Sequence, residues 1–395
     1  MKAPASTATT GGAGGVATGS APTRGLRGAA ALFAALGVAA GAWGAHVPSV
    51  KVRYGLDELG VAGVLLAAAA GAVLALFVAG RLVERWGTRC CVQGAGLVLA
   101  SGLAAVLHMP ARPLLWALML LVGASMSVFD VAVNAEGTAL ELLSGRKVMA
   151  RLHALFSVGG MSGAGFVAAM FALGLAPALQ LAVLALAVGV AVRFGAQRLH
   201  AQHLPQRAAA GTGRRMLWRG EVWLLGLLML AAMVAEGALY DWSALYLSQE
   251  LRQPAATAAL GFAVFAGAMA VARLGADALR VRWPEGRLLA AGSALCALAM
   301  TAALLLRHPA AALAGFALAG VGLAAAVPIL FTAATRIAGV PRASAIAAVS
   351  AIGYAGFMIG PPLIGALARV WSLGAALGVV VAASATLALF APRIP

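Results

Sequence analysis

Residues 80–89 read GRLVERWGTR and form a short charged island between two long apolar stretches, residues 60–80 and 91–108. A helix needs about 20 mostly apolar residues to cross the hydrocarbon core of a bilayer, and both stretches are close to that length. Each is therefore predicted to be a membrane-spanning helix. The island is predicted to be the loop that joins them on one side of the membrane.

The composition extends this prediction to the whole chain. Of 395 residues, 63% are hydrophobic and 10% are charged, and the mean hydropathy is +0.96; soluble proteins are about 45–50% apolar. The apolar stretches lack the alternation of barrel strands, so the spans are predicted to be helices. A net charge of +16 would suggest a nucleic-acid partner in a soluble protein. Here the basic residues gather in loops, where they orient a membrane protein, so no nucleic-acid partner is expected.

Charge clusters and Pro or Gly breaks divide the chain into twelve predicted spans. They are residues 28–48, 60–80, 91–108, 113–133, 150–173, 177–194, 222–247, 255–279, 288–306, 310–331, 344–368 and 373–390. If the N-terminus is cytoplasmic, the outward loops hold only six of the 28 basic residues. This bias predicts a multi-pass protein of a bacterial-type inner membrane, with both termini in the cytoplasm.

The two halves of the chain share features at corresponding positions. This internal repeat predicts an all-α fold of two pseudo-symmetric six-helix bundles. Glycine-rich sequence opens both the fifth and the eleventh span, and charged residues end both the second and the eighth. The predicted parts are a disordered cytoplasmic tail at 1–27, bundles at 28–196 and 221–395, and a basic linker at 197–220. Many secondary transporters have such repeats, with the substrate site at their interface. Cys90, Cys91 and Cys296 lack metal-ligand spacing, so no metal or other cofactor is expected.

The charged island resembles the major-facilitator signature between spans two and three, usually written G-x-L-x-D-R-x-G-R-R. Glu84 stands at the usual Asp position, and Thr88 replaces an Arg. The resemblance implies a cytoplasmic gate, whose charged groups pair in one arrangement of the helices and separate in another. The expected gate residues are Gly80, Arg81, Glu84, Arg85, Gly87 and Arg89. The alternative is an ordinary basic loop. Residues 272–280 are a degenerate copy of the motif.

Polar residues lie near the end of the predicted fourth span. Asp130 and Asn134 are four residues apart and share a helix face, whereas Glu136 falls elsewhere and is expected at the interface. Ionisable groups at membrane depth cost about 2.5–3.5 kcal/mol on insertion scales, so they normally face a cavity or a partner. Asp130 and Asn134 are candidates for the substrate or proton path, with a structural hydrogen bond as the alternative. His153 is a candidate partner for one of the carboxylates, or a plain interfacial histidine.

Glu236 is the deepest acidic residue in the chain. A helix that begins near Val222 places it about 21 Å into the seventh span, at about 1.5 Å per residue. Burial favours the neutral form of a carboxyl group, so a residue at this depth can bind and release protons near neutral pH. Tyr240 lies one turn further on the same face, and Asp241 is expected at the outer interface. We predict that Glu236 and Tyr240 line the transport path; the alternative for Glu236 is a neutral or paired structural role.

Three further residues are candidates for the path. Trp43 and His46 lie at the outer end of the first span, before the helix breaker Pro48. Histidine titrates near physiological pH and could join proton movement, whereas a tryptophan there could simply belong to the interfacial aromatic belt. The eleventh span is rich in glycine, which favours close helix packing. Its Tyr354 is the side chain expected in the cavity.

Several strings together resemble bacterial inner-membrane permeases near the fucose permeases. They are WGAHVPSV (43–50), FDVAVNAEG (129–137), HALFSVGG (153–160), AEGALYDWSALYL (235–247) and GYAGFMIGPPLIG (353–365). The resemblance implies alternating-access transport by proton symport, with a cavity between the halves. Relatives often have Arg where this chain has His46, so the resemblance supplies no anion-pairing role there.

The sequence therefore predicts a monomeric secondary transporter of a small polar metabolite, with a sugar as one candidate cargo and the proton as the coupling ion. Its expected partners are the cargo and the lipid bilayer. Within transport, the alternative is proton-antiport export of drugs or hydrophobic metabolites. Outside transport, the alternatives are a sensor built on a carrier fold, or a membrane-embedded enzyme with Asp130, Glu136 and His153 as an acid/base cluster. No outward loop is long enough to shape an enzyme site, so an enzyme is not expected.

Overall fold

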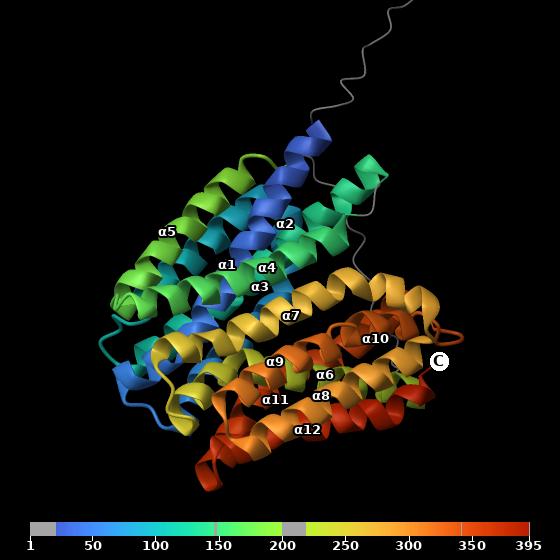
Figure 1. The fold of residues 1–395 in the computed structure, drawn as a ribbon. Coiled ribbons are helices and arrows are strands. Elements are labelled where there is room, and N and C mark those ends of the chain that lie inside the picture. The colour runs from blue at the N-terminus through green and yellow to red at the C-terminus, as the bar shows by residue number, and fades with distance from the viewer. Residues whose placement is uncertain (1–20, 146–147, 200–218, 341, 395) are drawn as a thin grey trace, which may run out of the picture.

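The computed structural model describes residues 21–145, 148–199, 219–340 and 342–394, and these are nearly all helical (Figure 1). The helices of the first half are α1 (Ala21–Tyr54), α2 (Glu58–Ala105), α3 (Arg112–Ser144), α4 (Met149–Ala172) and α5 (Pro177–Ala196). Those of the second half are α6 (Gly220–Leu245), α7 (Ala255–Arg282), α8 (Glu285–Leu306), α9 (Pro309–Leu323), α10 (Ala326–Ala334), α11 (Arg342–Val370) and α12 (Leu373–Phe390). Two short segments, η2 (Tyr246–Glu250) and η3 (Ala391–Arg393), follow α6 and α12.

Twelve membrane crossings follow from these helices. Within the described residues, 11 segments are long and apolar enough to cross a bilayer. One of them, α2, has 48 residues and a length of about 72 Å, which is more than twice the thickness of the hydrocarbon core. It contains a break at Gly87, whose φ of 78° and ψ of 157° are not helical. The segment before Gly87 and the segment after it are therefore separate crossings.

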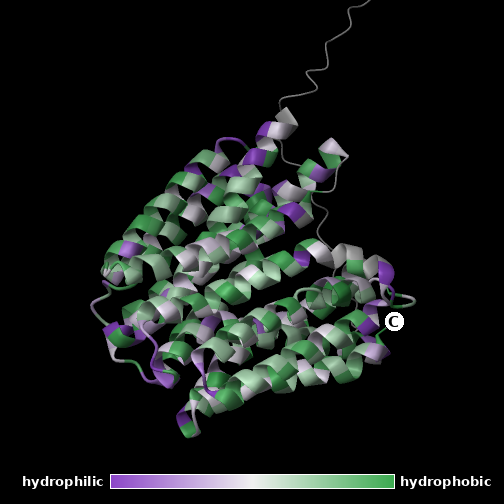
Figure 2. Cartoon of the chain, in the orientation of Figure 1, coloured by the Kyte–Doolittle hydropathy of each residue, from purple (hydrophilic) through white to green (hydrophobic). Residues whose placement is uncertain are grey.

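The outer surface of the helices is apolar. Large side chains such as Phe77, Leu186 and Leu298 are 70–74% exposed, which a soluble monomer avoids over so wide an area. Hydrophobic residues cover the length of the helices, and hydrophilic residues concentrate toward their ends (Figure 2). The surface thus fits the hydrocarbon core of a bilayer.

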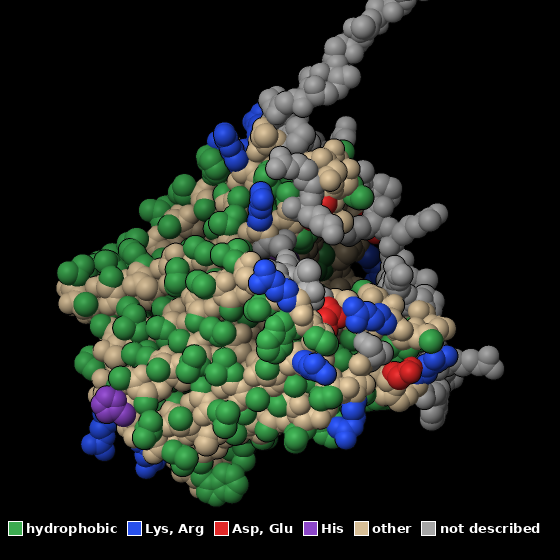
Figure 3. All heavy atoms as spheres, turned by 45° about the vertical axis from the view of Figure 1, so that its right-hand side comes forward, with side chains coloured by type: hydrophobic (Ala, Val, Ile, Leu, Met, Phe, Trp, Pro, Cys, Tyr) green, Lys and Arg blue, Asp and Glu red, His purple; other side chains and the backbone are tan. Residues whose placement is uncertain are grey.

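The helices form two groups, α1–α5 and α6–α12 (Figure 1). We call the side where α1 begins and α12 ends the terminal face, and the other side the opposite face. Toward the opposite face, Lys51 reaches Gln249 of the second half, with 2.7 Å between Nζ and Oε1. Gly365 packs there on Ala62 and on the backbone of Glu58. At the terminal face the surface is hollowed between the groups (Figure 3). The two groups are thus in contact at the opposite face and separated at the terminal face.

Some helix boundaries differ from those predicted. The first helix begins at Ala21, inside the predicted tail; Pro22 is compatible with a first helical turn, where its missing N–H is not needed. The same helix continues through Pro48 to Tyr54, because packed neighbours in membrane proteins compensate the hydrogen bond that a proline removes. The third helix extends eleven residues beyond the predicted end, to Ser144. The remaining tail residues 1–20 and most of the predicted linker, 200–218, lie outside the described residues.

Close packing explains the glycines of the eleventh span. A side chain at Gly356 would meet the backbone oxygen of Leu230 at 2.8 Å, and one at Gly353 would collide with Met229. Both contacts are with α6. The glycines therefore let α11 approach α6, as the sequence predicted.

Candidate functional site

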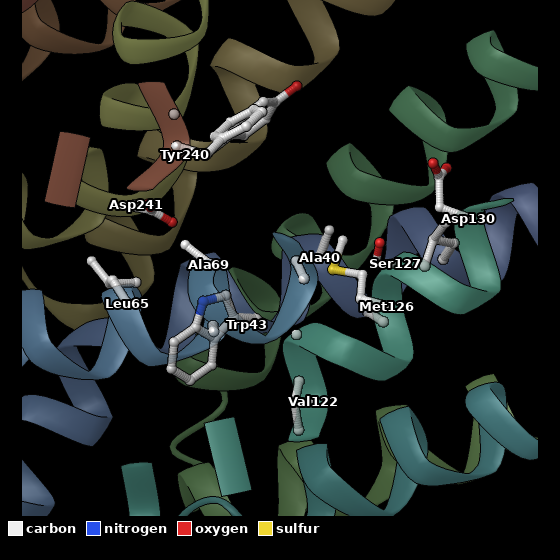
Figure 4. A pocket seen from close by; sticks show the side chains of 18 of the residues that line it. Ala40, Trp43, Leu65, Ala69, Val122, Met126, Ser127, Asp130, Tyr240 and Asp241 are labelled. Atoms are coloured by element: carbon white, nitrogen blue, oxygen red, sulfur yellow. The ribbon is translucent and has the colours of Figure 1, made fainter. Parts of the chain in front are cut away.

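A cavity of about 410 Å³ lies between the two groups of helices. The first group contributes α1, α2, α3 and α4, and the second contributes α6, α7 and α11. The lining is mostly apolar and includes six aromatic residues, Trp43, Phe156, Tyr240, Phe262, Tyr354 and Phe357. Figure 4 shows part of it at close range. The volume lies within the range of pockets that bind small molecules, about 300–1,000 Å³.

Three carboxylates line this cavity, and its described lining contains no Lys, Arg or His. Glu236 and Asp241 come from α6, and Asp130 comes from α3. Glu236, Asp130, Trp43, Tyr240 and Tyr354 were all predicted to lie in the path, and the structure brings them together. Asp241 was expected at the outer interface but lines the cavity instead. Its five-residue offset from Glu236 does not remove it from the lining, because the cavity borders a wide sector of α6.

Glu236 is paired with a cation that the sequence did not assign to it. Its Oε1 lies 3.3 Å from Nη2 of Arg273 on α7, and Glu236 is only 9% exposed. Arg273 was predicted to belong to the charged end of the eighth span, 255–279; α7 continues to Arg282, nine residues beyond Arg273. The only available signal was the position of this Arg inside an apolar stretch, where a cation needs a partner. Glu236 thus both lines the cavity and takes part in an ion pair.

Asp130 and Asn134 are joined by a hydrogen bond within α3. The side-chain amide of Asn134 donates to the backbone oxygen of Asp130 at 2.8 Å and to its Oδ1 at 3.0 Å. Asp130 lines the cavity, whereas Asn134 does not. The predicted hydrogen bond between the two residues is thus present, and the role of Asp130 in the path stays a prediction.

Glu136 is buried, with 3% exposure, and does not lie at the interface as expected. The hydroxyl of Thr88 donates to its Oε2 at 3.1 Å. Thr88 follows the break at Gly87, so this bond ties α3 to the start of the third crossing. Thr88, which replaces an Arg of the signature, thus has a short side chain that forms a hydrogen bond with the buried Glu136.

Neither His46 nor His153 lines the cavity. His46 is fully buried; its Nδ1 lies 3.3 Å from Oγ of Ser49, and its ring centroid lies 5.4 Å from that of Phe171. The ring of His153 lies against Phe33, at 5.3 Å between centroids. The predicted pairing of His153 with a carboxylate of α3 is not seen among the described residues. Its ring packs instead on α1, which contacts α4 closely.

The gate motif lies at the terminal face around the break in α2. Arg81, Glu84, Arg85 and Arg89 are exposed, and they form no ion pair with the described residues. The segment predicted as a loop is helical on both sides of Gly87, because one glycine with positive φ suffices for the change of direction. Gly80 has open space around it. A gate with separated charges is consistent with the hollow at this face, and its role in transport stays a prediction.

Two relatives align over most of the chain. An uncharacterized MFS-type transporter of Yersinia pestis is 35% identical over 350 residues, which cover 88% of this chain and 89% of the relative. Membrane protein MosC of Rhizobium meliloti is 30% identical over 349 residues, which cover 88% of this chain and 84% of MosC. No family model matches the sequence.

Solved structures share the fold. A crystal structure of a point mutant of the nucleoside transporter NupG matches with a TM-score of 0.77 and 11% identity, over 94% of this chain and 99% of NupG. A bacterial homolog of the human lysosomal transporter Spinster, in an inward-facing and unoccupied conformation, matches with a TM-score of 0.70 and 13% identity, over 95% and 98% of the two chains.

Twelve crossings around a central cavity define the chain as a multi-pass membrane transporter. More narrowly, the length and identity of the match to the Yersinia pestis protein show that it belongs to the major facilitator superfamily. A further relative, an uncharacterized transporter of Sinorhizobium fredii, is 31% identical over 369 residues, which cover 93% of this chain and 97% of the relative. It and the Yersinia pestis protein are both named as transporters, in agreement with the expectation that this chain is not an enzyme.

Proposed function

We propose that this transporter moves a small polar metabolite together with protons, by alternating access around the central cavity. A sugar is one candidate cargo, in keeping with the motifs shared with permeases near the fucose permeases. The observation that carries the proposal is the pair formed by Glu236 and Arg273, which joins α6 to α7 beside the cavity.

The pair suits proton coupling because its strength depends on one titratable group. A proton on Glu236 removes the negative charge that holds Arg273, so the contact between α6 and α7 weakens. A ligand or proton shifts a conformational equilibrium only when it binds one conformational state more tightly than the other. Because Glu236 also lines the cavity, cargo binding and proton binding would act on the same pair.

The distribution of basic residues supports an inner-membrane location with both termini in the cytoplasm. The opposite face holds the six basic residues assigned to outward loops, Lys51, Arg53, Arg112, Arg252, Arg307 and Arg369. The terminal face, with the larger share, would then be cytoplasmic. The hollow at this face would make the structure an inward-open state.

Proton coupling is tested by uptake into proteoliposomes under an imposed pH gradient, with a labelled panel of sugars, nucleosides and small amines. The native protein should accumulate at least one member. Glu236→Gln should abolish accumulation but retain downhill exchange of that member, because the variant keeps the cavity and loses the proton site. Glu221→Gln is the matched control, since Glu221 is an exposed acid in the first turn of α6.

Two results would contradict the proposal. Gradient-driven accumulation by Glu236→Gln at the native level would move the coupling site elsewhere. Binding of a panel member without flux in either direction would favour a sensor built on the carrier fold.

A further inference from the structure

We infer that the cargo is a small organic cation, an ammonium group on a body with an apolar or ring-shaped face, and that Asp241 anchors the ammonium. This inference rests on the proposed function and narrows its cargo. It follows from the charges and rings that meet in one cavity.

The charge balance of the lining is negative. Of its three carboxylates, Glu236 is neutralised by Arg273, and Asp130 accepts a hydrogen bond from Asn134. Asp241 forms neither a hydrogen bond nor an ion pair with any described residue. An uncompensated carboxylate at membrane depth is costly, so its normal companion is a cation or a proton. A cargo that carries an ammonium group supplies that companion on binding.

The aromatic side chains supply a second kind of recognition. Trp43 of α1, Tyr240 of α6 and Phe262 of α7 line the same cavity as Asp241, and the ring centroids of Tyr240 and Phe262 lie 4.9 Å apart. In Figure 4 the carboxyl group of Asp241 lies on the same side of the pocket as Trp43, and Asp130 lies on the far side. The face of an aromatic ring attracts a cation, and it also covers the apolar part of a ligand.

Other cargo charges fit this cavity poorly. An anion would meet three carboxylates and no basic side chain of the lining. A neutral polyol would leave Asp241 uncompensated and would find few hydroxyl partners, Ser127 and Ser157 among them. A site rejects a ligand that leaves its buried polar groups unpaired, so both kinds should bind more weakly than an amine of the same shape.

The test is a thermal-stability titration of the full chain in detergent at pH 7, with no pH gradient. The probes are two matched sets: phenethylamine, 2-phenylethanol and 3-phenylpropionate; and glucosamine, glucose and glucuronate. A ligand that binds only the folded state raises the melting temperature with its concentration. At least one amine should stabilise the protein, and its neutral and acidic counterparts should not.

Asp241→Asn should weaken the apparent affinity for that amine by about tenfold or more, which corresponds to about 1.4 kcal/mol. Asp241→Glu should retain the preference for the amine, since it keeps the charge. If Asp241→Asn fails to fold, the amine preference of Asp241→Glu still tests the role of the charge at this position. Glu221→Gln, outside the cavity, should bind as the native protein does.

Three results would overturn the inference: equal or stronger stabilisation by neutral or acidic probes, native amine affinity in Asp241→Asn, or no stabilisation by either amine at millimolar concentration. None of these bears on proton coupling, because the titration has no gradient. Conversely, amine binding without gradient-driven flux would contradict the proposed symport and leave the cargo class intact.

Discussion

At the scale of single residues, the sequence identified two of the three cavity acids but not the cation that pairs with Glu236. Glu236 stood out because an acid so deep in an apolar stretch is rare. Arg273 lies 37 positions further along the chain, and no local rule connects residues at that separation. Asp241 was wrongly predicted at the outer interface for a related reason. The sequence gives only its angle around the helix relative to Glu236, and does not give the width of the sector of α6 that borders the cavity. The depth of a residue in the membrane can thus be estimated from one helix, whereas an ion pair between two helices can be predicted only when their packing is known.

The ion pair predicts a coupled effect on stability. Removing either partner leaves a largely buried charge uncompensated, a loss of roughly 3 kcal/mol or more. Arg273→Gln and Glu236→Gln should therefore each lower the melting temperature, with the larger effect from Glu236→Gln, because the Arg273 left behind keeps its charge, whereas an unpaired Glu236 can become neutral by binding a proton. The double variant should be more stable than the sum of the two losses predicts. Thermal unfolding of the four proteins in one detergent provides the measurement. Strictly additive losses would show that the two side chains do not interact.

At the scale of elements, the existence of each membrane-spanning helix was easier to predict than the residues at which it begins and ends. Twenty apolar residues leave little alternative to a membrane helix, and each such stretch is helical in the structure. The ends were harder because breakers depend on their surroundings. Pro48 does not end α1, and the polar sequence after Val133 continues α3. The charged island was read as a loop, yet Gly87 alone makes the turn.

The two motif glycines should therefore differ in their tolerance to substitution. Gly87 adopts a combination of φ and ψ open essentially to glycine alone, and strain of this kind costs about 1–3 kcal/mol. Gly87→Ala should lower the melting temperature and the yield of folded protein. Gly80 is helical with no atom within 4 Å of an added Cβ, so Gly80→Ala should be neutral or slightly stabilising. Equal effects of the two changes would argue against the turn at Gly87.

At the scale of the whole molecule, the charge bias predicts the orientation in the membrane. Arg112 begins α3 at the opposite face, and Glu221 lies in the first turn of α6 at the terminal face. In a background without Cys90, Cys91 and Cys296, Arg112→Cys should react with a membrane-impermeant thiol reagent in intact cells. Glu221→Cys should react only after the membrane is opened. The reverse pattern would invert the proposed orientation.

The arrangement of the two halves could not be read from the sequence, because a carrier sequence encodes more than one state. The structure shows one of them, with contacts at the opposite face and a hollow at the terminal face. Lys51 is central to those contacts: its Nζ lies 2.6 Å from Oε1 of Glu58 and 2.7 Å from Oε1 of Gln249. Alternating access requires this connection between the halves to open during each cycle.

Locking that connection tests the central claim most directly. Cysteines placed at Lys51 and Gln249, in the same cysteine-free background, would be joined by a short thiol cross-linker in proteoliposomes, and flux of the cargo measured before and after. We predict that the cross-link stops flux while cargo binding persists, and that each single-cysteine variant is unaffected by the reagent. Full transport by the cross-linked protein would contradict alternating access around this cavity.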